Sequence, residues 1–137
     1  MQKLVCSLFL IFFLAIGCEK FEDSNLDFSN NLPQYVELTS GAAIASAPGM
    51  DVSIGVRIRE NINVDVTVNY DISGDFPSSG SVVIAEGDLS TAITLLIPAG
   101  AASGSATVTL TGVDNGLTLG RGGPAAGLSA ISRMVTW

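Results

Sequence analysis

The side chains of this chain that could do chemistry are mainly carboxylates, together with two cysteines. Histidine is absent from the whole sequence, and the cysteines are Cys6 and Cys18. The chain therefore lacks the usual nucleophile–base pairs, and the part that follows Cys18 lacks thiolates and the cysteine and histidine ligands of most zinc sites. Carboxylates could still act in pairs across a cleft, as in glycoside hydrolysis. The candidate carboxylates are Asp65, Asp71, Asp75, Glu86 and Asp88. They occupy predicted turns or solvent-facing sides of strands, where a role in solubility explains them, so we predict no catalytic residue.

Cys18 has a different context, because it ends an apolar segment at the start of the chain. Lys3 precedes an apolar run from Leu4 to Ile16. A run of about 13 residues suits a signal peptide, whereas a bilayer span needs roughly 20. A buried core helix is the alternative, but such a helix normally carries a polar face. Only Cys6 and Ser7 interrupt the run, so we predict a signal peptide over residues 1–17.

The segment Leu14-Ala15-Ile16-Gly17-Cys18 resembles the lipobox of bacterial lipoproteins, although Ala15 stands where leucine is usual. The resemblance implies cleavage before Cys18, a diacylglyceryl group on its sulfur and an amide-linked acyl chain. An ordinary secretory signal that leaves a free Cys18 is the alternative, but a lone thiol is a redox liability in an exported protein. Acyl chains anchor a protein stably, because each buried methylene contributes about 0.8 kcal/mol. The sequence therefore predicts lipid attachment at Cys18.

The charge balance restricts the partners. The chain has 6 basic and 13 acidic side chains, a formal net charge of −7, and removal of Lys3 with the signal makes the mature chain more negative. Nucleic acids call for clustered lysine and arginine, so no nucleic-acid partner is expected. Attachment to the membrane is expected through lipid on Cys18 rather than through charge.

Residues 18–32 are predicted to be a flexible tether, since they are polar and show no period of a strand or helix. The tether begins with the charged stretch Glu19-Lys20-Phe21-Glu22-Asp23. This stretch is similar to the lipoprotein export signals of Bacteroidetes, which implies a place in the cell envelope, on the outer membrane and at its outer face. A plain acidic tether is the alternative.

Alternation of apolar and polar residues predicts a series of short strands after the tether. The two clearest cover residues 51–59 and 64–72, with inward Val52, Ile54, Val56, Ile58, Val64, Val66, Val68, Tyr70 and Ile72. Further strands are predicted at 34–38 with a continuation at 42–45, and at 81–85, 91–97, 106–110, 117–119 and 130–137. Residues 73–80 are predicted to be a loop because Ser, Gly and Pro cluster there.

This series predicts an all-β domain over residues 33–137. Short alternating strands separated by turn residues are typical of an antiparallel β-sandwich with immunoglobulin-like architecture. Strands of a parallel sheet would instead be apolar on both faces. No cysteine lies in the predicted domain, so its stability must come from packing rather than from a disulfide.

Residues 51–111 resemble a Calx-beta domain of the divergent kind found in lipoproteins of Bacteroidetes. The resemblance rests on the strand 64–72, the loop Gly74-Asp75-Phe76, the strand 80–84, the turn 86–90 and the strand that ends at Ile97-Pro98. It implies a Calx-beta-like sandwich, and Calx-beta domains often bind calcium through acidic loops. Asp75 falls on an acidic position of the family.

Other family positions depart from a calcium site. The acidic run expected after Ile97 is replaced by residues 98–103, Pro-Ala-Gly-Ala-Ala-Ser, and Ser40-Gly41 stands where glutamate is common. Calcium takes six to eight oxygen ligands. We therefore expect Asp75 to cap its loop, and we predict no metal or cofactor.

Two other features are candidate binding sites. The loop Gly120–Pro124 is rich in glycine, but it lacks the Gly-Lys-Ser/Thr ending and the helix of a phosphate-binding loop, which favours a plain or bulged loop. Tyr35, Phe76 and Trp137 could form a sugar-stacking platform, although single aromatic residues at the ends of a sandwich are more often core plugs.

The sequence as a whole predicts a lipid-anchored envelope β-sandwich with a binding, adhesion or scaffolding role and no catalysis. An envelope protein or a glycan is the expected class of partner, and edge-strand addition is a physical mode open to it. Two alternatives stay open at this point. One is a calcium-binding Calx-beta-type module, and the other is an accessory subunit of a hydrolase that processes envelope glycans.

Overall fold

The structure is a computed structural model that describes residues 34–121 and 130–137. These two stretches contain β-strands and no helix. The strands are β1 Tyr35–Leu38, β2 Ile44–Ala45, β3 Asp51–Ile58, β4 Val66–Gly74, β5 Ser78–Ile84, β6 Ser90–Leu96, β7 Ser105–Val113, β8 Thr118–Leu119 and β9 Ser132–Thr136.

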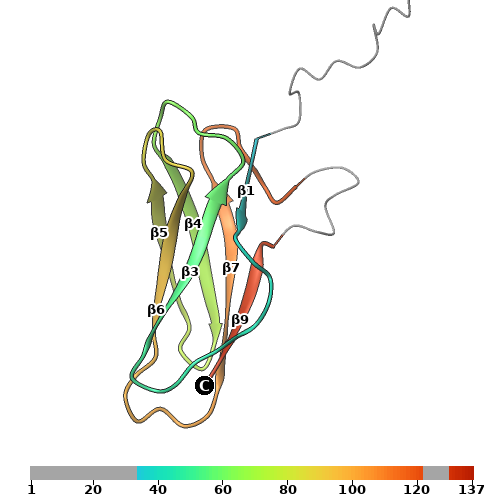
Figure 1. The fold of residues 1–137 in the computed structure, drawn as a ribbon. Helices are drawn as coiled ribbons and strands as arrows, with labels where there is room; N and C mark the ends of the chain where they lie inside the picture. Colours follow the sequence, from blue (N-terminus) through green and yellow to red (C-terminus); the bar gives the residue numbers. More distant parts are fainter. Residues whose placement is uncertain (1–33, 122–129) are drawn as a thin grey trace, which may run out of the picture. The chain divides into compact units, whose positions relative to one another are not determined.

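The strands form two sheets packed face to face (Figure 1). One has the order β6-β3-β1-β8 and the other the order β2-β9-β7-β4-β5. The long strands pair antiparallel, whereas the short pairs β1–β8 and β2–β9 are parallel. The predicted all-β sandwich is thus confirmed, with two short parallel pairings added.

The N-terminal strand changes sheets. We predicted that residues 42–45 continue the strand 34–38 after a break. In the structure β1 pairs with β3 in one sheet, and β2 pairs with β9 in the other. The break at Ser40-Gly41 therefore lets the chain cross the edge of the sandwich.

The core lies between the sheets and follows the predicted alternation. In β3 every second residue from Val52 to Ile58 is buried, and the residues between them are more exposed. Burial of such an aliphatic side chain stabilises the fold by about 1.5–3 kcal/mol relative to leaving it in water. The other buried apolar residues are Val36, Leu38, Val66, Val68, Ile72, Ile84, Ile93, Leu95, Ile97, Ala106, Val108, Leu110 and Val135.

Several predicted boundaries differ from the structure, and three of them change how a residue or segment is interpreted. Val64 was expected to face the core, but it precedes β4 and is 49% exposed. Residues 73–80 were expected to be a loop, yet only Asp75–Pro77 separate β4 from β5. The last strand, predicted over 130–137, covers Ser132–Thr136.

Residues 78–81, Ser-Ser-Gly-Ser, belong to β5 rather than to a loop. The serines are exposed to solvent, and the glycine fits a position where a side chain would clash. Gly80 pairs with Tyr70, and a Cβ on Gly80 would lie 2.7 Å from the Tyr70 hydroxyl oxygen. Glycine therefore leaves room for the tyrosine ring to cross the neighbouring strand. Ser79 and Ser81 are exposed, so their turn-forming tendency is overridden by pairing with β4.

The end of β4 gives a direct test of the fold. Gly74 has a φ of +113°, and a Cβ there would run into the carbonyl oxygen of Ser105. Gly87 has a φ of +82° but open space around it. We expect Gly74→Ala to lower the free energy of unfolding by about 2–3 kcal/mol, and the matched Gly87→Ala to lower it by about 1 kcal/mol. Equal losses in urea denaturation would show that the close approach of β4 to Ser105 is wrong.

Candidate functional site

Cys18 lies outside the described residues, as do the predicted signal peptide 1–17 and tether 18–32. Lipid attachment at Cys18 therefore stays a prediction. Across residues 34–121 and 130–137, no helix is long and apolar enough to span a bilayer.

The carboxylates that were candidates for catalysis or calcium lie in loops, except Asp71, which is on β4. Asp75 Oδ2 accepts a 2.8 Å hydrogen bond from the Ser105 N–H, in agreement with the predicted capping role. Asp65 Oδ1 accepts one from the Glu86 N–H at 2.8 Å. Asp71, Glu86 and Asp88 are exposed. Within the described part of the chain, no group of three or more His, Cys, Asp or Glu side chains could hold a metal ion.

Two of the three aromatic candidates meet. The rings of Phe76 and Trp137 stack with centroids 5.6 Å apart and an interplanar angle of 24°. Trp137 Nε1 also donates to the Ala102 carbonyl oxygen at 2.8 Å. Tyr35 lies on β1 in the other sheet and faces Arg121, whose Cζ is 5.5 Å from the ring centroid. The structure therefore does not assemble a three-ring platform. Of the loop Gly120–Pro124, residues 122–124 lie outside the described residues.

The sequence pattern does not predict that one carboxylate, Glu37, is buried, with only 2% of it exposed. Glu37 lies on β1 opposite Arg57 of β3. Its Oε1 accepts hydrogen bonds from Arg57 Nη2 at 2.6 Å and Arg57 Nε at 3.0 Å. Arg121, just after β8, donates to the same oxygen from Nη2 at 3.1 Å. The carboxylate thus joins three segments of one sheet.

The electrostatics of this cluster are those of a structural ion pair. The hydrogen bond to Glu37, and then its charge, raise the pKa of Arg121 above the ordinary value for arginine. A carboxylate withdrawn from water costs several kcal/mol unless it is paired, and the two guanidinium groups supply that pairing. The alternation gives no sign of this pair, and only the register of β1 against β3 brings Glu37 and Arg57 together.

The outer edge of β6 is the second feature that the alternation did not reveal. At the two ends of the β3–β6 ladder, Ile58 N donates to Leu89 O at 3.0 Å and Ile97 N donates to Met50 O at 3.2 Å. Hydrogen-bonded pairs alternate along an antiparallel ladder. The intervening residues Ala92, Thr94 and Leu96 therefore point their N–H and C=O groups away from β3, toward the open edge.

A cavity of about 470 Å³ adjoins the lower half of this edge. It lies where the β4–β5 turn faces the end of β6, on the side of the sandwich where β5 and β6 run beside each other (Figure 1). Ile72 and Leu95, both buried, contribute to its lining, and Leu96 is 64% exposed beside it. The remaining lining residues are Tyr70, Asp75, Phe76, Pro77, Ser78 and Thr94.

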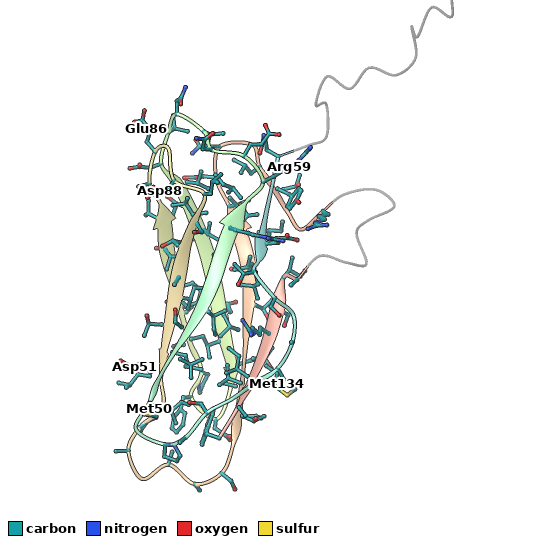
Figure 2. All side chains as sticks on the ribbon, in the orientation of Figure 1. Met50, Asp51, Arg59, Glu86, Asp88 and Met134 are labelled. Carbon is teal, nitrogen blue, oxygen red and sulfur yellow. The ribbon has the colours of Figure 1, made fainter. Side chains whose placement is uncertain are left out.

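The surroundings of β6 are acidic. Figure 2 shows Glu86 and Asp88 near one end of the strand and Asp51 near the other, with Arg59 across the molecule. Asp51 pairs with Leu96 in the ladder, and Asp75 lines the cavity. The arginines of the described segments bond elsewhere: Arg57 and Arg121 to Glu37, Arg59 to Glu60, and Arg133 to the Ala42 carbonyl.

Comparisons with known proteins identify the fold. No protein-family model and no curated protein matches the chain. A crystal structure of the apo form of the Calx CBD1 domain matches with a TM-score of 0.55 and 11% identity, over 75% of this chain and 96% of that one. A structure of CBD12 from CALX1.2 matches with a TM-score of 0.56 and 13% identity, over 74% of this chain and 42% of that one. The predicted Calx-beta-like fold is confirmed, and at such identities the likeness concerns the fold alone.

The Glu37 cluster gives a stability prediction. We expect Arg57→Ala to lower the free energy of unfolding by about 2 kcal/mol, because a buried carboxylate would lose two short hydrogen bonds. Asp88→Ala is the control, because it removes an exposed charge that precedes β6, and the expected loss is below about 0.5 kcal/mol. Similar midpoints for both variants in urea would refute the structural role of the cluster.

Proposed function

We propose that this protein is a bacterial lipoprotein whose sandwich is a binding or scaffolding module of the cell envelope, without catalysis of its own. The single observation that carries the binding role is that β5 and β6 each end a sheet, with an open edge, in the part of the chain that the structure describes. Each is seven residues long and contains no charged residue and no proline. Native proteins usually protect an exposed edge with charges, proline or a bulge. An edge left open in this way is suited to a partner.

The anchor in this proposal is lipid on Cys18, supported by the apolar run before it and the polar segment after it. The acidic stretch 19–23 supports the outer membrane, with the sandwich exposed at the surface, in a bacterium of the Bacteroidetes type. An envelope protein or a glycan is the proposed partner. The net charge of −7 argues against nucleic acid.

The absence of catalysis is proposed from the use that the fold makes of its carboxylates. Asp65 and Asp75 accept hydrogen bonds from loop N–H groups, and Glu37 is held by two arginines. Asp75 lines the cavity beside β6, but that lining contains no second carboxylate, which carboxylate-pair hydrolysis requires.

Lipid anchoring predicts how the chain partitions. Cys18→Ser removes the sulfur that would carry the diacylglyceryl group, so most of the variant should appear in the soluble fraction after cell disruption. Cys6→Ser is the matched control, because Cys6 lies in the predicted signal, and it should stay with the membranes. Recovery of Cys18→Ser in membranes as complete as that of the parent would contradict the anchor, as would an intact mass of the mature N-terminus without acyl groups.

The calcium alternative has its own test. Because Asp75 already caps Ser105, we expect thermal unfolding curves with added calcium and with a chelator to coincide. A ligand present at 100 times its Kd would stabilise the fold by about 2.7 kcal/mol. A melting temperature that rises with calcium concentration would therefore replace the proposed role with that of a calcium-binding module.

A further inference from the structure

We propose that β6 is the docking edge, and that it accepts an extended, basic segment of a partner protein as an added strand with one apolar side chain in the adjoining cavity. This inference rests on the proposed binding function and names its site and the chemistry of its partner.

The backbone supplies the first part of the site. Ala92, Thr94 and Leu96 direct their N–H and C=O groups outward, as the ladder with β3 requires. These are the groups that an incoming strand would bond, and main-chain hydrogen bonds of this kind provide affinity without sequence preference. No side-chain charge on β6 obstructs the approach.

The cavity supplies the second part. Side chains of a strand point alternately to its two faces, so a strand beside Thr94–Leu96 would direct every second side chain between the sheets. The cavity at that point measures about 470 Å³ and contains Ile72, Leu95 and Phe76 in its lining. An aromatic or branched aliphatic side chain would fit this volume and contact these three apolar residues, while Asp75, Ser78 and Thr94 form the polar part of the lining; its burial would favour peptides that carry it at the matching position.

The acidic residues around β6 supply the third part of the site, and they indicate that the partner segment is basic. The acidic groups around the edge are Asp88 before β6, Asp51 opposite Leu96, and Asp75 in the cavity. An occupant with lysine or arginine near the ends of its strand would complement them. A second copy of this chain would bring the same acidic groups to the edge, so repulsion disfavours pairing of β6 with itself.

The test compares proline substitutions on two edges. Proline removes one N–H and is tolerated where that N–H points to solvent. Thr94 meets this condition on β6. On β5 the matched position is Ser81. The hydrogen bonds from Asp75 N to Ser105 O and from Asp114 N to Thr67 O show that every second residue of β4 bonds to β7.

The alternate residues Val68 and Tyr70 therefore bond to their β5 partners Val82 and Gly80. Ser81 lies between these two partners, so its N–H points outward.

The probe is a fluorescent synthetic peptide that alternates threonine and valine, with a central phenylalanine and a lysine at each end. Fluorescence anisotropy would measure its binding to the full chain in mild detergent. We expect Thr94→Pro to weaken binding at least about tenfold and Ser81→Pro to change it less than about twofold. Equal affinities of Thr94→Pro and the parent, or no binding to the parent, would overturn the inference.

A second variant keeps the test decisive if Thr94→Pro does not fold. Asp51→Lys changes an exposed charge beside Leu96 and should weaken binding of the lysine-ended peptide while it strengthens binding of a glutamate-ended version. Equal binding of both peptides to the parent would refute a basic occupant, and binding of an oligosaccharide in the cavity in place of the peptide would refute a strand. Failure here leaves the proposed lipid anchor standing, because the partition of Cys18→Ser tests the anchor separately.

Discussion

A β-strand has two hydrogen-bonding edges, and a sandwich made of two open sheets cannot satisfy all of them. In the described residues β6 and β8 end one sheet, and β2 and β5 end the other. β2 and β8 are two-residue strands, so they expose few backbone groups. β5 and β6 are long, uncharged and adjacent. Most backbone N–H and C=O groups without a strand partner in the described residues therefore lie along β5 and β6, on one side of the sandwich. The proposed binding role depends on this uneven distribution.

The remainder of the molecule holds this side in place. The inward aliphatic residues of β3, β4, β6 and β7 interlock between the sheets, and no cysteine after Cys18 can add a disulfide. Glu37 joins β1 to β3 and to the segment after β8 through Arg57 and Arg121. β3 also pairs with β6. The buried ion pair between β1 and β3 therefore stabilises the sheet whose open edge is β6.

The sequence alone predicts the fold class well, because alternation in β3, β6 and β7 reflects burial on one face directly. It fails at Val64, which precedes β4, and at Gly80, whose place in β5 depends on Tyr70 across the sheet. Glu37 and the β6 edge were missed for the same reason. The partner of Glu37 is Arg57, 20 positions away, and a strand becomes an edge only through the order of the sheet, which alternation does not encode. Lipid attachment at Cys18, in contrast, is predicted from the neighbouring residues in the sequence alone and does not depend on how the strands are arranged.

The most direct measurement is amide hydrogen exchange of the full chain in its native membranes, compared with the same chain purified in detergent. If β6 is occupied by a partner strand in the envelope, peptides that cover residues 90–96 will exchange more slowly in the membranes, and those from β5 will exchange alike in both samples. Equal exchange of β6 in the two samples would contradict the account.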